Sequence, residues 1–385
     1  MSQVSPFPAP FVNELVGDDP TVIEPRPPVG TTAIVYCEGH FGEQDGKTAN
    51  GLVRFSERYD ILSVIDGSHD GEDAGDRLDG IPNGIPVVAS LASALAAAER
   101  MPDYLIFGLA PANGLLSPAH RAVLLDGMDH GMHIVNGLHE FLNDDPEFVA
   151  AAARNAVTIT DVRRPKEMKD LHLFSGSIFE VTCPRIAVLG TDSAVGKRTT
   201  STLLVQALNE RGIKAVLVGT GQTSIMQGGK YGVALDAIVP QFCSGEVENQ
   251  VVAAFRGESP DVIVIEGQGA LSHPAYMSST HILRGSQATA VIVQHAPRRR
   301  TLGDFPMMAV PTVSSEVALI EAFADTRVIG VTMNHEGMAS DEIHLAIADL
   351  ETSTGLPVTD PLTRPLDDLA DMVLSAFPRL EPTGR

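Results

Sequence analysis

The clearest chemical signal in the chain is a Gly-Lys turn between an apolar run and a helix-forming stretch. The apolar residues 186–189 lead into a loop of small residues, and Lys197 stands where the helix is expected to begin. Backbone N–H groups of such a loop and of the helix N-terminus bind phosphate, and the lysine adds a positive charge. The sequence therefore predicts a phosphate-binding site formed by Gly190, Thr191, Asp192, Ser193, Ala194, Val195, Gly196, Lys197, Arg198 and Thr199.

One position of this loop departs from the pattern of magnesium-dependent nucleotide hydrolases. In those enzymes a Ser or Thr follows the lysine, and its hydroxyl binds the metal. Here that residue is Arg198, whose guanidinium has no lone pair to donate, and Thr199 lies about 100° further around the helix. We therefore expect a loop that binds phosphates and holds no metal. The alternative is that Arg198 points to solvent and a metal binds through water.

Candidate acid–base residues follow the apolar strand predicted at residues 262–265. Ligands of open α/β sheets bind beyond the carboxyl ends of the strands, so Glu266 is expected to face the phosphate loop. It is either a metal ligand or a general base. We favour the base, because the metal-binding hydroxyl is missing and because burial would raise the pKa of this carboxyl. His273 is a second candidate base, or else a hydrogen-bonded structural residue.

Several polar residues are candidates for binding the rest of a ligand. Gln222 and Thr223 follow another predicted strand and suit a carboxylate or phosphate, unless their loop has no role in binding. Residues 298–300 are three successive arginines, of which we expect Arg298 or Arg299 to grip a carboxylate, the alternative being a solvated turn. Asn334 ends a further strand and could pair with the edge of an adenine ring.

Short apolar runs alternate with helix-length stretches along most of the chain, for example with a helix expected at residues 49–58. This alternation is typical of βα units on a parallel sheet and predicts an α/β fold. We expect a Rossmann-like domain followed by a P-loop NTPase-like domain with a mainly parallel sheet. The predicted boundaries are an irregular segment 1–30, the first domain 31–160, a basic linker 161–180 and the second domain 181–385. The linker is either solvated or an arginine-bearing wall of a cleft.

Composition limits the partners of this protein. Its 385 residues include 27 Lys and Arg against 49 Asp and Glu, a net charge of −22, which repels nucleic acid and anionic lipid and suits a salt-rich, halophilic cytoplasm. Cys37, Cys183 and Cys243 are too scattered for a disulfide framework, and only Cys243, expected in a loop, is considered as a covalent relay. The sequence shows no signal peptide and no apolar run of about 18 residues. We expect a cytoplasmic homo-oligomer that acts on a small molecule.

Three segments resemble the P-loop enzymes related to dethiobiotin synthetase: Gly-Thr-Asp-Ser-Ala-Val-Gly-Lys, Ile-Glu-Gly-Gln-Gly and Val-Thr-Met-Asn-His. With Gly-Thr-Gly-Gln-Thr-Ser and the His-x-Pro-Arg segment, nearly the whole chain resembles the DgcN-type D-glutamate N-acetyltransferase family. That resemblance implies transfer of an acetyl group from acetyl-CoA to the amine of D-glutamate, giving N-acetyl-D-glutamate in D-amino acid breakdown. CoA carries a 3′-phosphate, a pyrophosphate and an adenine but needs no metal, which agrees with Arg198 in the loop.

Three hypotheses follow. In the first, Lys197 and Arg198 neutralise the phosphates of acetyl-CoA, Asn334 reads its adenine, and Glu266 or His273 deprotonates the amino acid. In the second, the protein is a Mg-ATP-dependent kinase or ligase of the dethiobiotin synthetase type, with Asp192 and Glu266 as metal ligands and Thr199 as the substitute for the missing hydroxyl. In the third, it is a non-catalytic nucleotide-responsive protein whose N-terminal half binds a partner.

Overall fold

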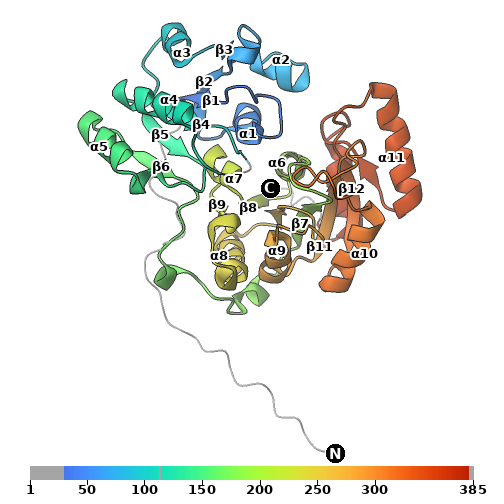
Figure 1. Ribbon diagram of the computed structural model, residues 1–385. Coiled ribbons are helices and arrows are strands. Elements are labelled where there is room, and N and C mark those ends of the chain that lie inside the picture. The colour runs from blue at the N-terminus through green and yellow to red at the C-terminus, as the bar shows by residue number, and fades with distance from the viewer. Residues whose placement is uncertain (1–29, 112–113, 381–385) are drawn as a thin grey trace, which may run out of the picture.

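The computed structural model describes residues 30–111 and 114–380, and in them the chain builds two β-sheets in succession (Figure 1). Every strand pairing in both sheets is parallel. The α/β fold class predicted from the sequence is therefore confirmed. The predicted irregular segment 1–30 lies outside the described residues, apart from Gly30.

The first sheet has six strands in the order β3-β2-β1-β4-β5-β6, which is the Rossmann order with its switch point between β1 and β4. The strands are β1 (Thr31–Tyr36), β2 (Tyr59–Ile65), β3 (Val87–Val88), β4 (Tyr104–Phe107), β5 (His133–Asn136) and β6 (Ile159–Asp161). The helices of this half are α1 (Lys47–Phe55), α2 (Ala74–Asp79), α3 (Leu91–Ala97), α4 (Pro118–Asp129) and α5 (Pro146–Asn155).

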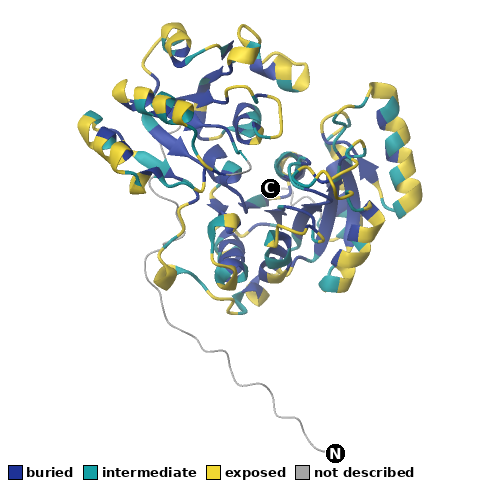
Figure 2. Cartoon of the chain, in the orientation of Figure 1, coloured by how far each residue is buried: buried dark blue, intermediate teal, exposed yellow. Residues whose placement is uncertain are grey.

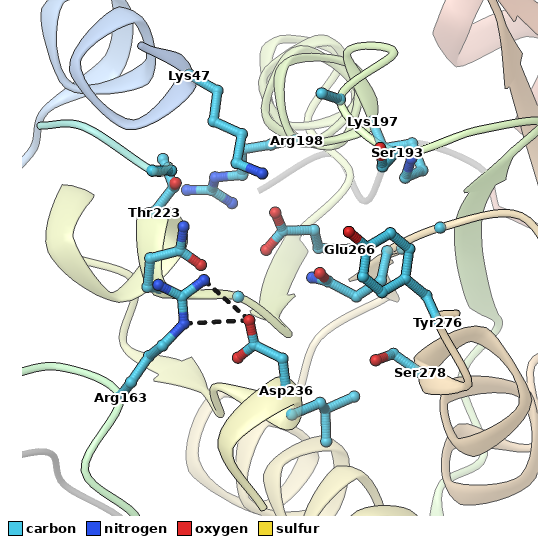
Figure 3. Close-up of a pocket in the computed structure, with 18 of the residues that line it drawn as sticks. Lys47, Arg163, Ser193, Lys197, Arg198, Thr223, Asp236, Glu266, Tyr276 and Ser278 are labelled. Carbon is cyan, nitrogen blue, oxygen red and sulfur yellow. Dashed lines mark hydrogen bonds and ion pairs between the residues drawn. The ribbon is translucent and has the colours of Figure 1, made fainter. Parts of the chain in front are cut away.

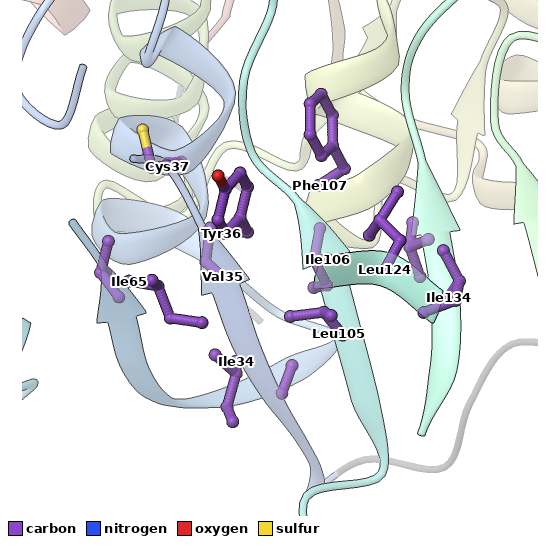
Figure 4. Packing of buried hydrophobic residues seen from close by; sticks show 14 of the residues in the cluster. Ile34, Val35, Tyr36, Cys37, Ile65, Leu105, Ile106, Phe107, Leu124 and Ile134 are labelled. Carbon is purple, nitrogen blue, oxygen red and sulfur yellow. The ribbon is translucent and has the colours of Figure 1, made fainter. Parts of the chain in front are cut away.

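The central strands of this sheet are largely apolar and buried because helices cover both of its faces. Ile34 and Val35 of β1 are fully buried, as are Leu105 and Ile106 of β4 beside them (Figure 4). Burying each such side chain stabilises the fold by about 1.5–3 kcal/mol. This packing fixes the carboxyl ends of β1 and β4, from which the loops of the functional site depart.

The second sheet has seven strands in the order β13-β12-β11-β7-β10-β8-β9, with β7 at its centre. The strands are β7 (Arg185–Gly190), β8 (Ala215–Gly219), β9 (Tyr231–Gly232), β10 (Val262–Glu266), β11 (Ala290–His295), β12 (Val328–Met333) and β13 (Val358–Thr359). The helices are α6 (Lys197–Glu210), α7 (Gln222–Gln227), α8 (Pro240–Glu258), α9 (Ser278–Ser286), α10 (Val313–Phe323), α11 (Ser340–Thr354) and α12 (Asp367–Ala376).

Alternate residues of β7 pack into different cores. Ile186 and Val188 join the cluster on one face of the sheet, whereas Ala187 and Leu189 join the cluster on the other. Figure 2 shows the result, with dark-blue strands inside and yellow helix faces toward solvent. The strand that leads into the phosphate loop is thus held from both sides.

The structure differs from the predicted elements in three places. The helix predicted at residues 49–58 is α1, which begins two residues earlier and ends at Phe55. The segment expected as a loop around Gln222 and Thr223 contains helix α7. Cys243 does not lie in a loop, because α8 begins at Pro240, a favourable first helical residue, and buries this cysteine.

All the cysteines are free and buried. Within residues 30–111 and 114–380, we find no helix of the length and apolar character that crossing a bilayer requires.

Candidate functional site

The carboxyl ends of both sheets open onto one cavity of about 590 Å³. From the first sheet, the loops after β1, β4 and β5 contribute to its lining, and from the second, the loops after β7, β8 and β10. Figure 3 shows the side chains that converge there from the two halves. This is the edge at which open parallel sheets bind their ligands, so the cavity is the candidate active site.

The predicted phosphate loop forms one wall of this cavity. Ser193, Ala194, Gly196, Lys197 and Arg198 line it. Gly196 has a φ of 104°, a left-handed conformation that glycine adopts without strain, and it turns the chain into α6. The Lys197 ammonium donates a hydrogen bond to the backbone oxygen of Asp192 at 2.5 Å, and burial lowers the pKa of Lys197 to about 7. An anion bound here would favour the charged form.

Other residues of the phosphate loop hold its conformation through contacts with residues outside the cavity. Asp192 is fully buried, and its carboxylate accepts hydrogen bonds from Arg299 at 3.0 Å and from the backbone N–H of Gly303 at 2.9 Å. Arg299 also donates to the backbone oxygen of Ser193 at 2.7 Å. Predicted to hold substrate, Arg299 instead lies outside the cavity lining and fixes the phosphate loop.

Arg198 reaches into the cavity and does not point to solvent (Figure 3). Its Nε donates a hydrogen bond to Oε1 of Gln227 at 2.6 Å, which draws the guanidinium away from the phosphate loop toward α7. Its Nη1 is buried and has no hydrogen-bond partner among the described residues. Thr199, the substitute metal ligand of the kinase hypothesis, is not among the residues that line the cavity.

Glu266 ends β10 and is buried in the cavity wall, as the strand pattern indicated. Its Oε2 accepts a hydrogen bond from the backbone N–H of Thr220 at 3.1 Å. Burial raises the pKa of this carboxyl, and the positive charge of Arg198 is the strongest of the nearby influences that oppose the rise. Glu266 therefore combines access to a ligand with an environment that makes it a stronger base than an exposed glutamate.

His273 is placed differently from Glu266. It is buried and does not line the cavity. Its Nδ1 accepts a hydrogen bond from the backbone N–H of Ala275 at 3.2 Å, and its ring stacks on Tyr276 with centroids 4.4 Å apart. Burial lowers the pKa of His273. Tyr276, on which the ring stacks, lines the cavity, whereas His273 itself does not.

The other predicted ligand residues divide into two groups. Gln222 and Thr223 line the cavity at the first turn of α7. Arg298 lies outside it, half-exposed and paired with Glu342. Asn334 is also outside the lining and donates a hydrogen bond to the backbone oxygen of Val195 at 3.2 Å, so it supports the loop from the side away from the cavity.

Sequence reasoning missed a lysine that the N-terminal half contributes. Lys47 begins α1 in a Gly46-Lys47-Thr48 turn, and its exposed side chain lines the cavity. Desolvation lowers the pKa of this lysine. Its position echoes that of Lys197, since each follows a glycine between the first strand of its half and the next helix. That Gly-Lys-Thr signal was available in the sequence.

Arg163 bears on the alternatives left open for the linker. It is buried and lines the cavity, and its Nη2 lies 2.9 Å from Oδ2 of Asp236. The basic segment therefore supplies an arginine to the wall of the cleft, and at this residue it is not a solvated connection.

Among the described residues, three cations of the cavity lining are not neutralised by an ion pair, although carboxylates also line the cavity. Lys47, Lys197 and Arg198 all line it, and none of them has a carboxylate within ion-pair distance in the part of the chain that the structure describes. Burial lowers the pKa of each, which means that their charges are incompletely solvated. A phosphate or carboxylate would relieve this cost. No group of three or more His, Cys, Asp or Glu suited to a metal occurs among the described residues.

Comparison with known proteins places this architecture in a family. Profiles of a Rossmann-like domain (DUF1611_N) and of a P-loop domain (DUF1611_C), both described as domains of unknown function, match residues 67–165 and 172–370. A curated D-glutamate N-acetyltransferase of a Pseudoalteromonas species is 30% identical over 69% of this chain and 79% of its own. The protein of the same description from Tritonibacter scottomollicae is 30% identical over 69% of this chain and 80% of its own.

A solved structure is similar over almost the whole chain. The crystal structure of a DUF1611 family protein from Anabaena variabilis superimposes with a TM-score of 0.82 at 31% identity, covering 90% of this chain and all of the other.

Proposed function

Since the chain belongs to the DUF1611 family, we propose that it is an N-acetyltransferase that moves the acetyl group of acetyl-CoA to the amine of D-glutamate. The names of its curated relatives support this proposal, and so do the cations, unpaired among the described residues, that line the cavity between the two sheets. Both proposed ligands are anionic, and the products would be N-acetyl-D-glutamate and CoA.

In this proposal the phosphates of acetyl-CoA lie on the loop from Gly190 to Thr199. The loop offers backbone N–H groups at the start of α6 together with the Lys197 ammonium, which is the usual apparatus for a phosphate. Asn334 stays our candidate for contact with adenine, on the outer side of the loop.

The observation that carries the proposal is the side chain of Arg198, which takes the place in the sequence of the metal-binding hydroxyl of P-loop hydrolases and extends into the cavity. A guanidinium repels a divalent cation and attracts an anion. A ligand whose phosphates bind without magnesium suits such a site better than Mg-ATP does.

Glu266 is the proposed general base. Its carboxylate takes a proton from the ammonium of D-glutamate, and the free amine attacks the thioester carbonyl carbon to form the new C–N bond. The tetrahedral adduct collapses by breaking the C–S bond. Of the two protons that the nitrogen loses overall, one goes to the CoA sulfur and the other leaves through Glu266 to solvent. The acetyl group passes directly from CoA to the amine, so no acyl-enzyme forms. Burial raises the pKa of Cys243 to about 11, which keeps its thiol protonated and a poor nucleophile.

A thiol-release assay tests this function. The protein is incubated with acetyl-CoA and a panel of D- and L-amino acids at high salt, with EDTA or with Mg²⁺. We expect thiol release with D-glutamate that EDTA does not reduce. Release of ADP or phosphate from Mg-ATP would favour the kinase or ligase hypothesis, and nucleotide binding without turnover would favour the nucleotide-responsive protein.

A further inference from the structure

The two halves of the chain each direct one unneutralised cation into the same part of the cavity. Lys47 enters from α1 and Arg198 from α6, and Figure 3 shows both side chains reaching toward the space in front of Glu266. The Lys47 ammonium has no side-chain hydrogen bond or ion pair within the described residues and is open to the cavity, while Nη1 of Arg198 is buried without a partner. The buried donor of Arg198 calls for an acceptor that a ligand supplies, and the ammonium beside it can bind the same anion.

A chain of contacts independent of the picture holds Arg198 near α1. Gln227 accepts the Nε hydrogen bond of Arg198 through its oxygen, and its nitrogen donates to the backbone oxygen of Gly51 at 2.6 Å. Gly51 lies one turn after Lys47, so the two residues share a face of α1. Thr48 adds a second contact, with its hydroxyl oxygen 3.3 Å from that of Thr223 on α7.

Two glycines near Lys47 allow α1 to pack closely against α7. A Cβ atom on Gly46 would lie 2.1 Å from the carbonyl oxygen of His40, so only glycine allows the loop to turn here into α1. A side chain on Gly51 would similarly meet Thr223 at 2.8 Å. These two glycines let α1 sit close against α7 and bring Lys47 to the edge of the second sheet.

We infer that Lys47 and Arg198 together clamp the α-carboxylate of the amino acid substrate, so that each half of the chain contributes one cation to it. This inference rests on the proposed function. Arg198 is the strongest charged neighbour of Glu266, and the α-carboxylate is the acidic group of glutamate nearest to the amine that Glu266 must deprotonate. Arg198 is thus assigned to the substrate, and Lys197 keeps the phosphates.

The test compares three amine ligands in the full-length protein. D-Glutamate and D-glutamine share the α-carboxylate, whereas 4-aminobutanoate keeps the distal carboxylate and lacks the α-carboxylate. For Lys47→Met we expect the KM for D-glutamate and the inhibition constant of D-glutamine each to rise about 10-fold to 100-fold, the loss of one charge-assisted hydrogen bond. The inhibition constant of 4-aminobutanoate should change less than threefold.

Control variants distinguish loss of the carboxylate clamp from general damage to the fold. Lys47→Arg should restore most of the affinity, and Lys169→Met removes an exposed lysine of the linker and should behave as wild type. In the Lys47→Met/Arg198→Gln double variant, the combined effect should fall at least threefold short of the product of the single effects, because both groups bind one carboxylate. Loss of D-glutamate affinity alone, with D-glutamine unaffected, would overturn the assignment, as would loss of acetyl-CoA affinity in Lys47→Met.

The wild-type protein distinguishes failure of this inference from failure of the proposed function. If it releases no thiol with any amino acid, the acetyltransferase proposal fails by itself. Binding of D-glutamate, D-glutamine and 4-aminobutanoate, measured by saturation-transfer NMR, then gives the same comparison without turnover. Equal binding of D-glutamate to wild type and Lys47→Met would refute the clamp.

Discussion

Nη1 of Arg299 lies 3.0 Å from Oδ2 of Asp192, and the two side chains are 12% and 0% exposed. This buried pair closes the base of the phosphate loop. Removing one member of such a pair leaves an uncompensated charge in the interior, which costs about 3–5 kcal/mol.

The neighbouring arginine offers a matched control for a first prediction. Arg299→Met should lower the free energy of unfolding by about 3 kcal/mol or more, because buried Asp192 loses its cation. Arg298→Met should change it by about 1 kcal/mol or less, since Arg298 makes a half-exposed ion pair. Urea denaturation followed by circular dichroism measures both, and equal effects would show that Arg299 does not hold the loop.

The second prediction concerns the lysine of the loop. Lys197→Ala should weaken acetyl-CoA binding about 10-fold to 100-fold, the value of a charge-assisted hydrogen bond to phosphate. Desulfo-CoA, which keeps the phosphates and lacks the thiol, should lose affinity by the same factor in isothermal titration. An unchanged dissociation constant would place the phosphates elsewhere.

The same lysine makes a prediction about protons. Burial lowers the pKa of Lys197 to about 7 in the empty site, so the amine is mostly neutral at pH 8. A bound phosphate favours the charged form and raises this pKa, which means that binding takes up a proton. Titrations of CoA at pH 8 in buffers of different ionisation enthalpy should show net uptake that disappears in Lys197→Ala. Proton release, or no exchange, would contradict the assignment.

Glu266 yields a prediction about rate. Glu266→Gln should lower kcat about 10²-fold to 10⁴-fold and leave the affinity for acetyl-CoA within threefold, because the amide keeps the shape and cannot accept the proton. In the wild type, kcat/KM should fall as the pH drops through the pKa of Glu266, and burial places that fall above the range of an ordinary glutamate. If kcat/KM of the Glu266→Gln variant fell with pH in the same way as that of the wild type, the general base would be another residue.

Local patterns in the sequence predicted the phosphate wall of the site. An apolar strand, a small-residue loop and Gly-Lys before a helix specify one compact unit, and the parallel sheet then requires Glu266 to lie at the same edge. The loop depends on short-range geometry, and Glu266 depends on the pairing of β10 with β7. Their chemical roles stay predictions.

Other positions depend on contacts between distant segments, which a single sequence does not reveal. Lys47 was not predicted as a site residue because the loop before it contains large residues such as His40 and Phe41 and so does not look like a phosphate loop. Its approach to the cavity also depends on how α1 packs against α7. The arginines at 298 and 299 are equivalent by composition. The turn in which Arg299 donates its backbone N–H to the oxygen of Ala296 directs one inward and leaves the other outside.

Gln227 touches both halves of the protein with one amide group, its oxygen toward Arg198 and its nitrogen toward Gly51. Sliding of one half over the other would drag the guanidinium with it. A change that breaks the hydrogen bonds of Gln227 should therefore first reduce turnover, while the melting temperature of each half stays the same.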